Sequence, residues 1–373
     1  MKNKNLKILL VMGSGAAPVP NSEIFKDNIY DSLVALGHDV RLIQFDKFLE
    51  KHNKESVVNK KKLLEEHILD VFKKESPFDF FLGFLSDEQV SPDLYKELNR
   101  EIFTVNWTCN SHQFDILHKI NSPFIGLNTY ISKNHEVLYD SVGAKSYWLP
   151  MAANENLYKT SDNQDIDISF AGSAYGNRPY YIWRLLQSGV GLELFGPGWL
   201  FNKTISNFLR LYIAPLLYNF TFNKNKLYYL DKSMRTIIQK QIMQMTQVGG
   251  IPDDHEYREI LSRSIVSLNF PESRKDNNYL NHELTFGCNF RDFEIPLSGS
   301  MLLTQDSEEF DFFYERDKEA VPFGNETDLI EKAKFFSKNY SAAKKISEAG
   351  YKRALQDHTW SKRFDQLFNH LIT

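Results

Sequence analysis

The sequence predicts an α/β protein built from two successive Rossmann-like domains that face one another across a cleft. Three observations support this prediction. A short apolar run, residues 6–12, leads directly into the glycine turn Gly13-Ser14-Gly15, as expected for a buried parallel strand followed by a helix. The same pattern restarts at residues 166–176, with a second glycine turn. The length of 373 residues also suits two domains of ordinary size.

The first half of the chain has the pattern of one strand–helix–strand unit followed by further strands. A helix-like segment at about 22–36 ends at Gly37-His38, and the apolar stretch 39–43 predicts the second strand. Later strands of the same sheet are predicted at 78–85, 102–107, 123–129 and 142–150. The last of these enters a linker, so we expect the first domain to span residues 1–150.

The second half repeats the alternation of strands and helices. After the strand and glycine turn at 166–176, further strands are predicted at 192–199, 264–270 and 300–305. Helices are predicted at 180–189, from near Phe293, and at 326–337, 341–356 and 360–372. We expect a second domain at 151–357 and a C-terminal helical segment at 358–373.

Residues 200–247 do not fit the α/β alternation. The segment is helix-like and amphipathic, with scattered basic residues, and Pro215 interrupts it. We interpret it as a helical insertion in the second domain. Two roles are open: a hairpin packed on the protein, or a peripheral contact with a membrane or a partner. The apolar and aromatic side chains at 205–222, flanked by Lys and Arg, would suit an interfacial helix.

Composition excludes several classes of function. The net charge of −4, with both signs scattered along the chain, does not suit a large nucleic-acid interface. The two cysteines, Cys109 and Cys288, form no CxxC pair, so neither a disulfide framework nor a zinc site is expected. No apolar run resembles a signal peptide or a membrane span. We expect a cytoplasmic protein that can lie at the inner face of the membrane.

The two glycine turns are candidate phosphate sites, because backbone amides at a strand–helix turn can hold an anion. Gly13 and Gly15 lie in the first turn, and Gly172 and Ser173 in the second. The alternative is a tight turn without a ligand. The Asp165-Ile166-Asp167 motif precedes its strand, at the edge opposite to the one where ligands of α/β sheets bind. The motif is therefore at the wrong edge for a metal site, and the adjacent pair Asp253-Asp254 is a weaker candidate still.

The stretch from Asn289 to Thr304 is the most informative. Glu294 begins a helix just before a short apolar strand, and a carboxylate at that edge can accept the hydroxyls of a ribose. Arg291, three residues earlier, can neutralise a phosphate or a carboxylate. The alternative is a helix-capping glutamate paired with a nearby arginine.

From about residue 140 onward the chain resembles the CgeB-like (spore-maturation) glycosyltransferases, which are relatives of glycosyltransferase family 4. The matching pieces follow the order of that family, cover more than half the chain, and are these: Gly143 with Leu149-Pro150; 167–173 with Arg178; Phe195-Gly196 with Gly198-Trp199; 267–270; Asn289-x-Arg291-x-Phe293-Glu294-Ile295 with Gly299; 302–304; and His358-Thr359-Trp360 with Arg363. The first domain matches mainly in its strand–glycine start and around Asn106-Trp107.

This resemblance implies the GT-B fold, with the acceptor bound by the first domain, residues 1–150, and the donor nucleotide held by the second. It implies that Glu294 binds the ribose and that Arg291, Gly172-Ser173 and Arg178 lie near the pyrophosphate. Asn269, Asn289 and Phe293 belong to the same implied donor site. The last helix, from about residue 360, is expected to return to the first domain.

The chain departs from the wider family in one respect. Retaining members carry a Glu-x7-Glu pair whose second glutamate aligns with Glu294, and the first position here is Phe286, with Glu283 the nearest glutamate upstream. The stereochemical outcome therefore stays open. An inverting mechanism would need a base in the first domain, for which His112 and Asp115 are the main candidates and His38 a further one.

The predicted function is that of a hexosyltransferase-type glycosyltransferase in surface polysaccharide or glycoconjugate synthesis. It would take a sugar from a nucleotide-sugar donor, by default a UDP-sugar, and would need neither a cofactor nor a metal. The acceptor would be a glycan, a lipid-linked sugar or a protein. The alternatives are a sugar-nucleotide epimerase or hydrolase on the same fold, and a non-catalytic nucleotide- or glycan-binding relative. The oligomeric state stays open.

Overall fold

The computed structural model describes residues 5–15, 19, 21–174, 176–200, 225–274 and 284–372. The chain divides into two compact units. The first contains the chain up to Leu157 together with the segment from Leu355 onward, and the second runs from Tyr158 to Ala354. The sequence placed these boundaries at 150 and 357.

A six-stranded parallel sheet forms the centre of the first unit, with strand order β2-β1-β3-β4-β5-β6. Its strands are β1 (Lys7–Met12), β2 (Asp39–Gln44), β3 (Phe80–Gly83), β4 (Phe103–Thr108), β5 (Leu127–Tyr130) and β6 (Ser146–Trp148). Every strand predicted for the first half is therefore confirmed. Residues 8–12 of β1 have no exposed surface, which explains their continuous apolar run in a strand covered on both faces.

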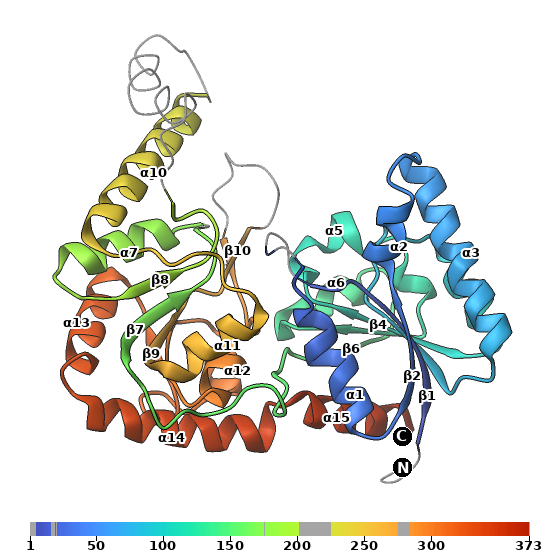
Figure 1. Cartoon of the computed structure of the whole chain (residues 1–373). Helices are drawn as coiled ribbons and strands as arrows, with labels where there is room; N and C mark the ends of the chain where they lie inside the picture. The colour runs from blue at the N-terminus through green and yellow to red at the C-terminus, as the bar shows by residue number, and fades with distance from the viewer. Residues whose placement is uncertain are drawn as a thin grey trace. The chain divides into compact units, whose positions relative to one another are not determined.

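Short helices connect these strands (Figure 1). They are η1 (Lys26–Tyr30), α1 (Asp31–Ala35), α2 (Phe45–Lys51), α3 (Val57–Glu75), α4 (Pro92–Leu98), η2 (Ser111–Gln113), α5 (Phe114–Leu117), η3 (Ser122–Phe124), η4 (Lys133–His135) and α6 (Glu136–Asp140). The helix predicted at 22–36 begins with a π-helical turn, η1, before it continues as α1.

The C-terminal helix α15 (Trp360–Ile372) belongs to the first unit. The Trp360 backbone N–H donates to the Ala153 carbonyl at 3.1 Å, and the Arg363 Nε donates to the Pro150 carbonyl at 3.1 Å. The Trp360 ring packs edge-on against that of Trp107, with centroids 5.4 Å apart. These contacts fix the end of the chain to the linker that follows β6.

The second unit contains a five-stranded parallel sheet with strand order β13-β12-β9-β7-β8. Its strands are β7 (Ile166–Ala171), β8 (Glu193–Phe195), β9 (Ser264–Asn269), β12 (Met301–Gln305) and β13 (Val321–Phe323), beside an antiparallel ribbon of β10 (Glu272–Arg274) and β11 (Leu284–Phe286). Its helical elements are α7 (Arg178–Gln187), α10 (Asn225–Met245), α11 (Asp254–Arg263), α12 (Arg291–Leu297), η6 (Phe310–Phe312), α13 (Glu326–Phe336) and α14 (Tyr340–Asp357).

Two layers of helices cover this second sheet (Figure 1). Helices α7, α10 and α13 lie on one face and share one apolar core with the strands. Helices α11 and α12 lie on the other face, where Ile260 packs with Ile166 and Ala171. Of the predicted insertion 200–247, the described part is mainly α10, and its Ile238 and Ile242 are buried in the core of the second unit. That part therefore packs on the protein.

Both sheets have a topological switch point. In each of them the chain leaves the first strand (β1 or β7) for the strand on one side and later returns to the strand on the other side. Loops leave such a point in opposite directions, so a crevice opens beyond the carboxyl ends of the two central strands, β1 and β3 in one sheet and β7 and β9 in the other. These two edges are where a ligand site is expected.

Candidate functional site

At the switch point of the second sheet, the turn after β7 packs tightly against the turn after β8. The Gly172 N–H donates to the Phe195 carbonyl at 2.9 Å, and the Trp199 indole N–H donates to the Gly172 carbonyl at 2.6 Å. A Cβ on Gly172 would come within 3.0 Å of the Arg291 Nη2. Glycine at this position therefore lets a guanidinium approach the backbone closely.

Two arginines converge on the carboxyl ends of the central strands. The Arg291 Nε donates to the carbonyl of Ala171, the last residue of β7, at 2.8 Å. The Arg178 Nη2 donates to the Phe270 carbonyl just after β9, at 2.8 Å, and its Nη1 donates to the Ser173 carbonyl at 3.4 Å. The structure thus brings Gly172, Ser173, Arg178 and Arg291 together at one edge of the sheet, as an anion site requires.

A buried amide network holds the loop that carries Arg291. The Asn269 Nδ2, at the end of β9, donates to the Asp292 Oδ1 at 2.7 Å, and its Oδ1 accepts from the Asn289 Nδ2 at 3.1 Å. The Asn289 Oδ1 in turn accepts from the Arg291 backbone N–H at 2.9 Å. Burial raises the pKa of Asp292 to about 6, against the opposing effect of these hydrogen bonds. Asn269 and Asn289 therefore position Arg291, through contacts that spacing along the chain does not reveal.

Glu294 lies one turn further along α12 and has only 1% of its surface exposed. Its two carboxylate oxygens accept hydrogen bonds from tyrosines: Oε1 from the Tyr158 hydroxyl and Oε2 from the Tyr257 hydroxyl, the latter at 2.7 Å. Burial raises the pKa of the carboxyl group, and the two tyrosine hydrogen bonds act in the opposite direction. Tyr257, on α11, is a partly exposed residue whose hydroxyl end is buried against the carboxylate.

Phe293 was predicted at the donor site, and the structure gives it a different role. Its ring has no exposed surface and packs edge-on against Phe313, with centroids 5.2 Å apart. A side chain on this face of α12 anchors the helix to the core beneath it. Phe293 therefore supports the position of Arg291 and Glu294 and offers no surface to a ligand.

Asp165 and Asp167 lie where the sequence placed them, away from the switch point, whereas Asp253-Asp254 begins α11 and Asp254 is close enough to Glu294 to raise the pKa of its carboxyl group. Asp165 just precedes β7 and forms a two-pronged ion pair with Arg263, with both N···O distances at 2.8 Å. Asp167 accepts from the Tyr340 hydroxyl at 2.9 Å. Asp253 caps α11 in a capping box with Glu256. The predicted location of Asp165 and Asp167 at the amino edge is thus confirmed, and the described residues contain no group of three or more His, Cys, Asp or Glu that could hold a metal.

Phe286, which occupies the first position of the Glu-x7-Glu pair of the wider family, lies on β11. Glu283, the nearest glutamate upstream, lies outside the described residues. Phe286 pairs across the antiparallel ribbon with Glu272 on β10. Glu272 is 3% exposed, its Oε2 accepts from the Asn177 backbone N–H at 2.8 Å, and burial raises its pKa. The sequence did not single out Glu272, because its pairing depends on the register of a ribbon that no local pattern marks.

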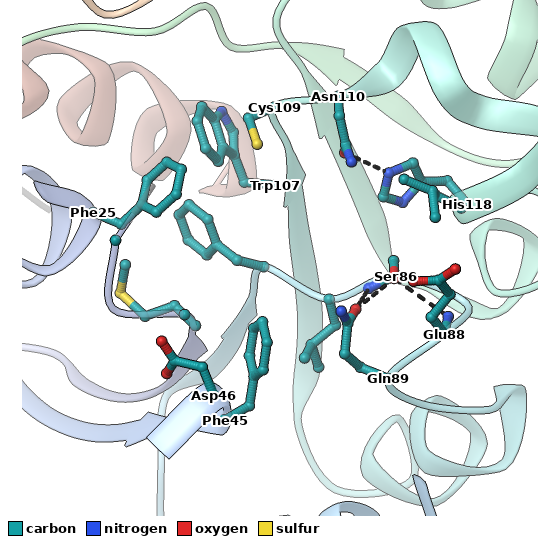
Figure 2. Close-up of a pocket in the computed structure, with 16 residues that line it drawn as sticks. Phe25, Phe45, Asp46, Ser86, Glu88, Gln89, Trp107, Cys109, Asn110 and His118 are labelled. Atoms are coloured by element: carbon teal, nitrogen blue, oxygen red, sulfur yellow. Dashed lines mark hydrogen bonds between the residues drawn. The ribbon is translucent and has the colours of Figure 1, made fainter. Parts of the chain in front are cut away.

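The first unit has a cavity of about 320 Å³ at the switch point of its own sheet (Figure 2). Its walls come from the carboxyl ends of four strands: Met12, Gly13 and Gly15 after β1; Phe45 and Asp46 after β2; Phe84, Leu85, Ser86, Glu88 and Gln89 after β3; and Trp107, Cys109 and Asn110 from β4 and its loop, with Phe25, Leu117 and His118. A Cβ on Gly15 would overlap the backbone carbonyl of Ser22, so the turn needs glycine there. Gly13 and Gly15 therefore line this cavity.

Asn106 explains how the cavity wall after β3 is held. Its Oδ1 accepts from the Leu85 backbone N–H and its Nδ2 donates to the Leu85 carbonyl, both at 3.0 Å. Through these two hydrogen bonds, the Asn106 amide fixes the loop after β3 that carries Phe84 and Ser86. This accounts for the sequence signal around Asn106-Trp107.

The candidate bases of the first unit are spread over different places. His112 lies on η2 and is not one of the cavity-lining residues, and burial lowers its pKa to about 4. Asp115, on α5, is exposed and pairs with Lys119, which lies just beyond the end of that helix. The Nδ1 of His38, just before β2, accepts from the Leu6 backbone N–H at the opposite, amino edge of the sheet. A base role for His112 or Asp115 remains a prediction.

His118, which the sequence did not single out, lines the cavity instead. Its Nε2 lies 2.8 Å from the Asn110 Oδ1, and burial, with a smaller contribution from His112, lowers its pKa to about 3. The imidazole is therefore neutral at ordinary pH, and its Nε2 donates to or accepts from the Asn110 amide according to its tautomer. Only the return of the chain after α5 brings His118 to this place.

The lowered pKa predicts a pH dependence of stability. An unfolded His118 would titrate near its ordinary pKa of about 6.5, whereas the folded state keeps it neutral. The unfolded state therefore binds more protons than the folded state between pH 6.5 and about 3. The free energy of unfolding decreases as the pH is lowered through that window. We expect His118→Gln, which keeps a donor for Asn110, to make the loss between pH 7 and pH 5 smaller by about 1–2 kcal/mol. Urea denaturation at both pH values tests this, and equal losses in the two proteins would contradict it.

The predicted membrane-contact segment, 205–222, lies outside the described residues. Among the residues that the structure describes, no helix combines the length and the apolar composition needed to cross a bilayer.

Comparison with known proteins agrees with this architecture. Residues 235–369 match the family model described as glycosyl transferase-like. Among curated protein sequences, none matches the chain. The computed structure is similar over nearly its whole length to several solved structures at low identity, which shows the fold. Sucrose-phosphate synthase from Thermosynechococcus elongatus has a TM-score of 0.61 at 11% identity, covering 99% of each chain.

Two further structures have the same fold. HepE from Anabaena, solved in complex with UDP-glucose, has a TM-score of 0.57 at 12% identity, covering 98% of this chain and 99% of its own. A putative UDP-N-acetylglucosamine 2-epimerase from Listeria monocytogenes has a TM-score of 0.54 at 11% identity, covering 97% and 94%. The predicted class of two Rossmann-like domains, the GT-B fold, is thereby confirmed.

Proposed function

We propose that this protein is a glycosyltransferase that takes a sugar from a UDP-sugar and transfers it to a glycan, a lipid-linked sugar or a protein. The observation that supports it best is the cluster at the carboxyl edge of the second sheet. Two arginines, a glycine turn and a buried carboxylate meet there, and Arg291 and Glu294 belong to the stretch that matches the glycosyl transferase-like family model. The order of its motifs supports a CgeB-like member of this superfamily.

Each part of the cluster has a chemical task. Transfer makes the nucleoside diphosphate a leaving group, whose growing negative charge must be stabilised. Arg291 and Arg178, with the Ser173 amide of the turn after β7, would supply positive charge and N–H donors without a proton transfer, whereas the Gly172 N–H is already bonded to the Phe195 carbonyl. Glu294 would accept the ribose hydroxyls, with the nucleotide replacing the hydrogen bond that Tyr257 now donates. A uridine nucleotide is the first donor to test, because the structurally similar HepE was solved with UDP-glucose.

A thermal-shift panel of nucleoside diphosphates tests the proposal, because a ligand that binds only the folded state raises stability. We expect UDP to raise Tm and UDP-sugars to be consumed once an acceptor is supplied. If no nucleoside diphosphate shifts Tm at millimolar concentration, the proposal is wrong.

An epimerase or hydrolase is the second candidate, since a putative UDP-N-acetylglucosamine 2-epimerase shares the fold. Mass spectrometry and NMR of a UDP-sugar incubated without acceptor separate the two. A changed sugar stereochemistry, or hydrolysis as fast as transfer, would favour this candidate.

We expect catalysis to proceed without a divalent ion. A metal that bridges a pyrophosphate needs carboxylate oxygens at the donor edge, but Asp165 and Asp167 lie at the amino edge and are already engaged with Arg263 and Tyr340. Transfer activity in EDTA should therefore stay above about half of the activity without the chelator, because EDTA removes no ion that takes part in catalysis. Loss of activity in EDTA that magnesium or manganese restores would contradict this.

We propose that segment 205–222 brings the protein to the inner face of the membrane. Its sequence combines apolar and aromatic residues with flanking lysines and arginines, which together favour binding to anionic lipid. We expect the protein to sediment with vesicles containing anionic lipid at low salt, and to stay in solution with neutral vesicles. If the intact protein does not bind anionic vesicles at low salt, the membrane contact is wrong and the segment has a structural role.

A further inference from the structure

Helix α10 contacts the turns after β7 and β8, at the edge of the proposed donor site. Two of its side chains, one helical turn apart, donate to backbone carbonyls there. The Arg235 Nη1 donates to the Gly176 carbonyl at 2.7 Å, and the Gln239 Nε2 donates to the Gly198 carbonyl at 2.6 Å. We propose that Arg235 and Gln239 are positioning residues for the donor pyrophosphate, so that the helical insertion sets the affinity of the donor site. This inference rests on the proposed function and adds a helix outside the cluster described above.

Arg235 acts on a single peptide group, the one that joins Gly176 to Asn177. The carbonyl of this group accepts from Arg235, and its N–H donates to the Glu272 Oε2 at 2.8 Å. Each end of the peptide dipole therefore faces a charge that attracts it. Turning the peptide over would place its oxygen against the carboxylate and its N–H against the guanidinium, where neither pair can form a hydrogen bond. The orientation of this peptide is thereby fixed.

Glycine at position 176 is a requirement of this arrangement. Its φ of +58° lies in the left-handed region, and a Cβ there would come within 2.3 Å of the Glu272 Oε2. Burial raises the pKa of Glu272, whereas the Asn177 N–H and the guanidinium groups of Arg178 and Arg235 act in the opposite direction. Arg178, expected at the pyrophosphate, directly follows the fixed peptide. Its position at the start of α7 therefore depends on Arg235.

Gln239 holds the turn after β8, against which the turn after β7 is packed. The Ala174 N–H donates to the Pro197 carbonyl at 2.9 Å, and the Gly172 N–H donates to the end of β8. Between these two contacts, the Ser173 N–H has no acceptor among the residues that the structure describes. It is the amide of this turn that can bind an anion. A shift of either turn would move it.

The apolar face of α10 fixes the two donors in place. Ile238 and Ile242 are buried in the core of the second unit, where α10 packs beside α7 (Figure 1). A displacement of α10 would therefore be transmitted to both turns through Arg235 and Gln239. Because coupling between two sites is reciprocal, a nucleotide that orders the turns must also stabilise α10.

Isothermal titration calorimetry of UDP with the full chain tests this inference. Arg235→Ala and Gln239→Ala should each weaken UDP about 3- to 10-fold, the usual size of one lost hydrogen bond. Uridine has no phosphate, so its affinity should change by less than about twofold in both variants. Arg235→Lys, which keeps one donor for the Gly176 carbonyl, should stay within about threefold of the parent protein. The exposed Lys240→Ala removes a cation from the same helix and is the matched control.

Hydrogen exchange of the α10 amides, followed by mass spectrometry, gives a second readout. Saturating UDP should slow this exchange in the parent protein and in Lys240→Ala. It should have little effect on the exchange in Arg235→Ala, because the contact between the turn and the helix is lost. A merely structural role of Arg235 would make exchange faster without UDP and would leave the effect of UDP unchanged.

The outcomes separate this inference from the proposed function. If Arg235→Ala and Gln239→Ala bind UDP as tightly as Lys240→Ala does, or if UDP and uridine lose affinity equally, the inference is wrong while the proposed function stands. If UDP does not bind the parent protein, both are wrong. Circular dichroism checks that each variant is folded. Arg235→Met, which keeps the apolar stem without a donor, replaces the alanine variant if that variant does not fold.

Discussion

Replacing Arg291 with alanine should weaken the binding of UDP about 10- to 100-fold and the binding of uridine by less than about threefold. The guanidinium lies at the carboxyl end of β7, where its Nε bonds to the Ala171 carbonyl and its Nη2 lies against Gly172. Charge-assisted hydrogen bonds to phosphate contribute about 1.5–3 kcal/mol, and each 1.4 kcal/mol is about tenfold in affinity. Uridine has no phosphate, so it should lose little. Isothermal titration calorimetry with both ligands measures the difference.

Arg263→Ala is the matched control for this experiment. Arg263 also bonds to a neighbour through its guanidinium, but its partner is Asp165 at the amino edge of the sheet. It should leave the affinity for UDP unchanged. Arg291→Lys should recover only part of the affinity, because an ammonium cannot bond to the Ala171 carbonyl and a phosphate with the same planar geometry. Equal losses for UDP and uridine in Arg291→Ala would remove Arg291 from the pyrophosphate.

The fold could be predicted because local pattern and global architecture agree. A parallel strand covered on both faces is largely apolar, so β1 stands out as a continuous apolar run. β7 contains Asp167 and Ser169, and it is recognised by its remaining apolar residues and by the glycine turn that follows it, as one follows β1. The exact start of the first helix could not be predicted, because it contains the π-helical turn η1, in which Asn28 and Ile29 are buried. Burial of these side chains depends on the tertiary structure, which the local sequence pattern does not show.

The candidate site could be predicted only where its residues lie close along the chain. Arg291 and Glu294 share one short helix, so spacing indicated them. The Asn269–Asn289–Asp292 network, the tyrosines on Glu294, and the Gln89 and His118 side chains at the cavity all join residues that strand order brings together. Phe293, in the same motif, is buried against Phe313, so a residue within a motif can also serve the core.

Glu294→Ala should have the other large effect, on both stability and donor binding. Removing the carboxylate leaves the Tyr158 and Tyr257 hydroxyls without their acceptor, and a buried unsatisfied donor costs about 1–3 kcal/mol. We therefore expect the free energy of unfolding to fall by about 2–4 kcal/mol, measured by urea denaturation. If Glu294 also accepts the ribose hydroxyls, UDP should bind at least about tenfold more weakly to the folded variant. A loss of stability alone would be expected of a purely structural glutamate.

Tyr257→Phe separates these two roles. It removes one hydrogen bond to Glu294 but keeps the ring, so the free energy of unfolding should fall by only about 1 kcal/mol. At the same time it frees Oε2, so a ribose hydroxyl no longer has to displace the tyrosine. Affinity for UDP should then be equal to that of the parent protein or higher, whereas Glu294→Ala reduces it. If Tyr257→Phe weakens UDP as much as Glu294→Ala does, the tyrosine hydroxyl contacts the nucleotide and Glu294 acts by holding it.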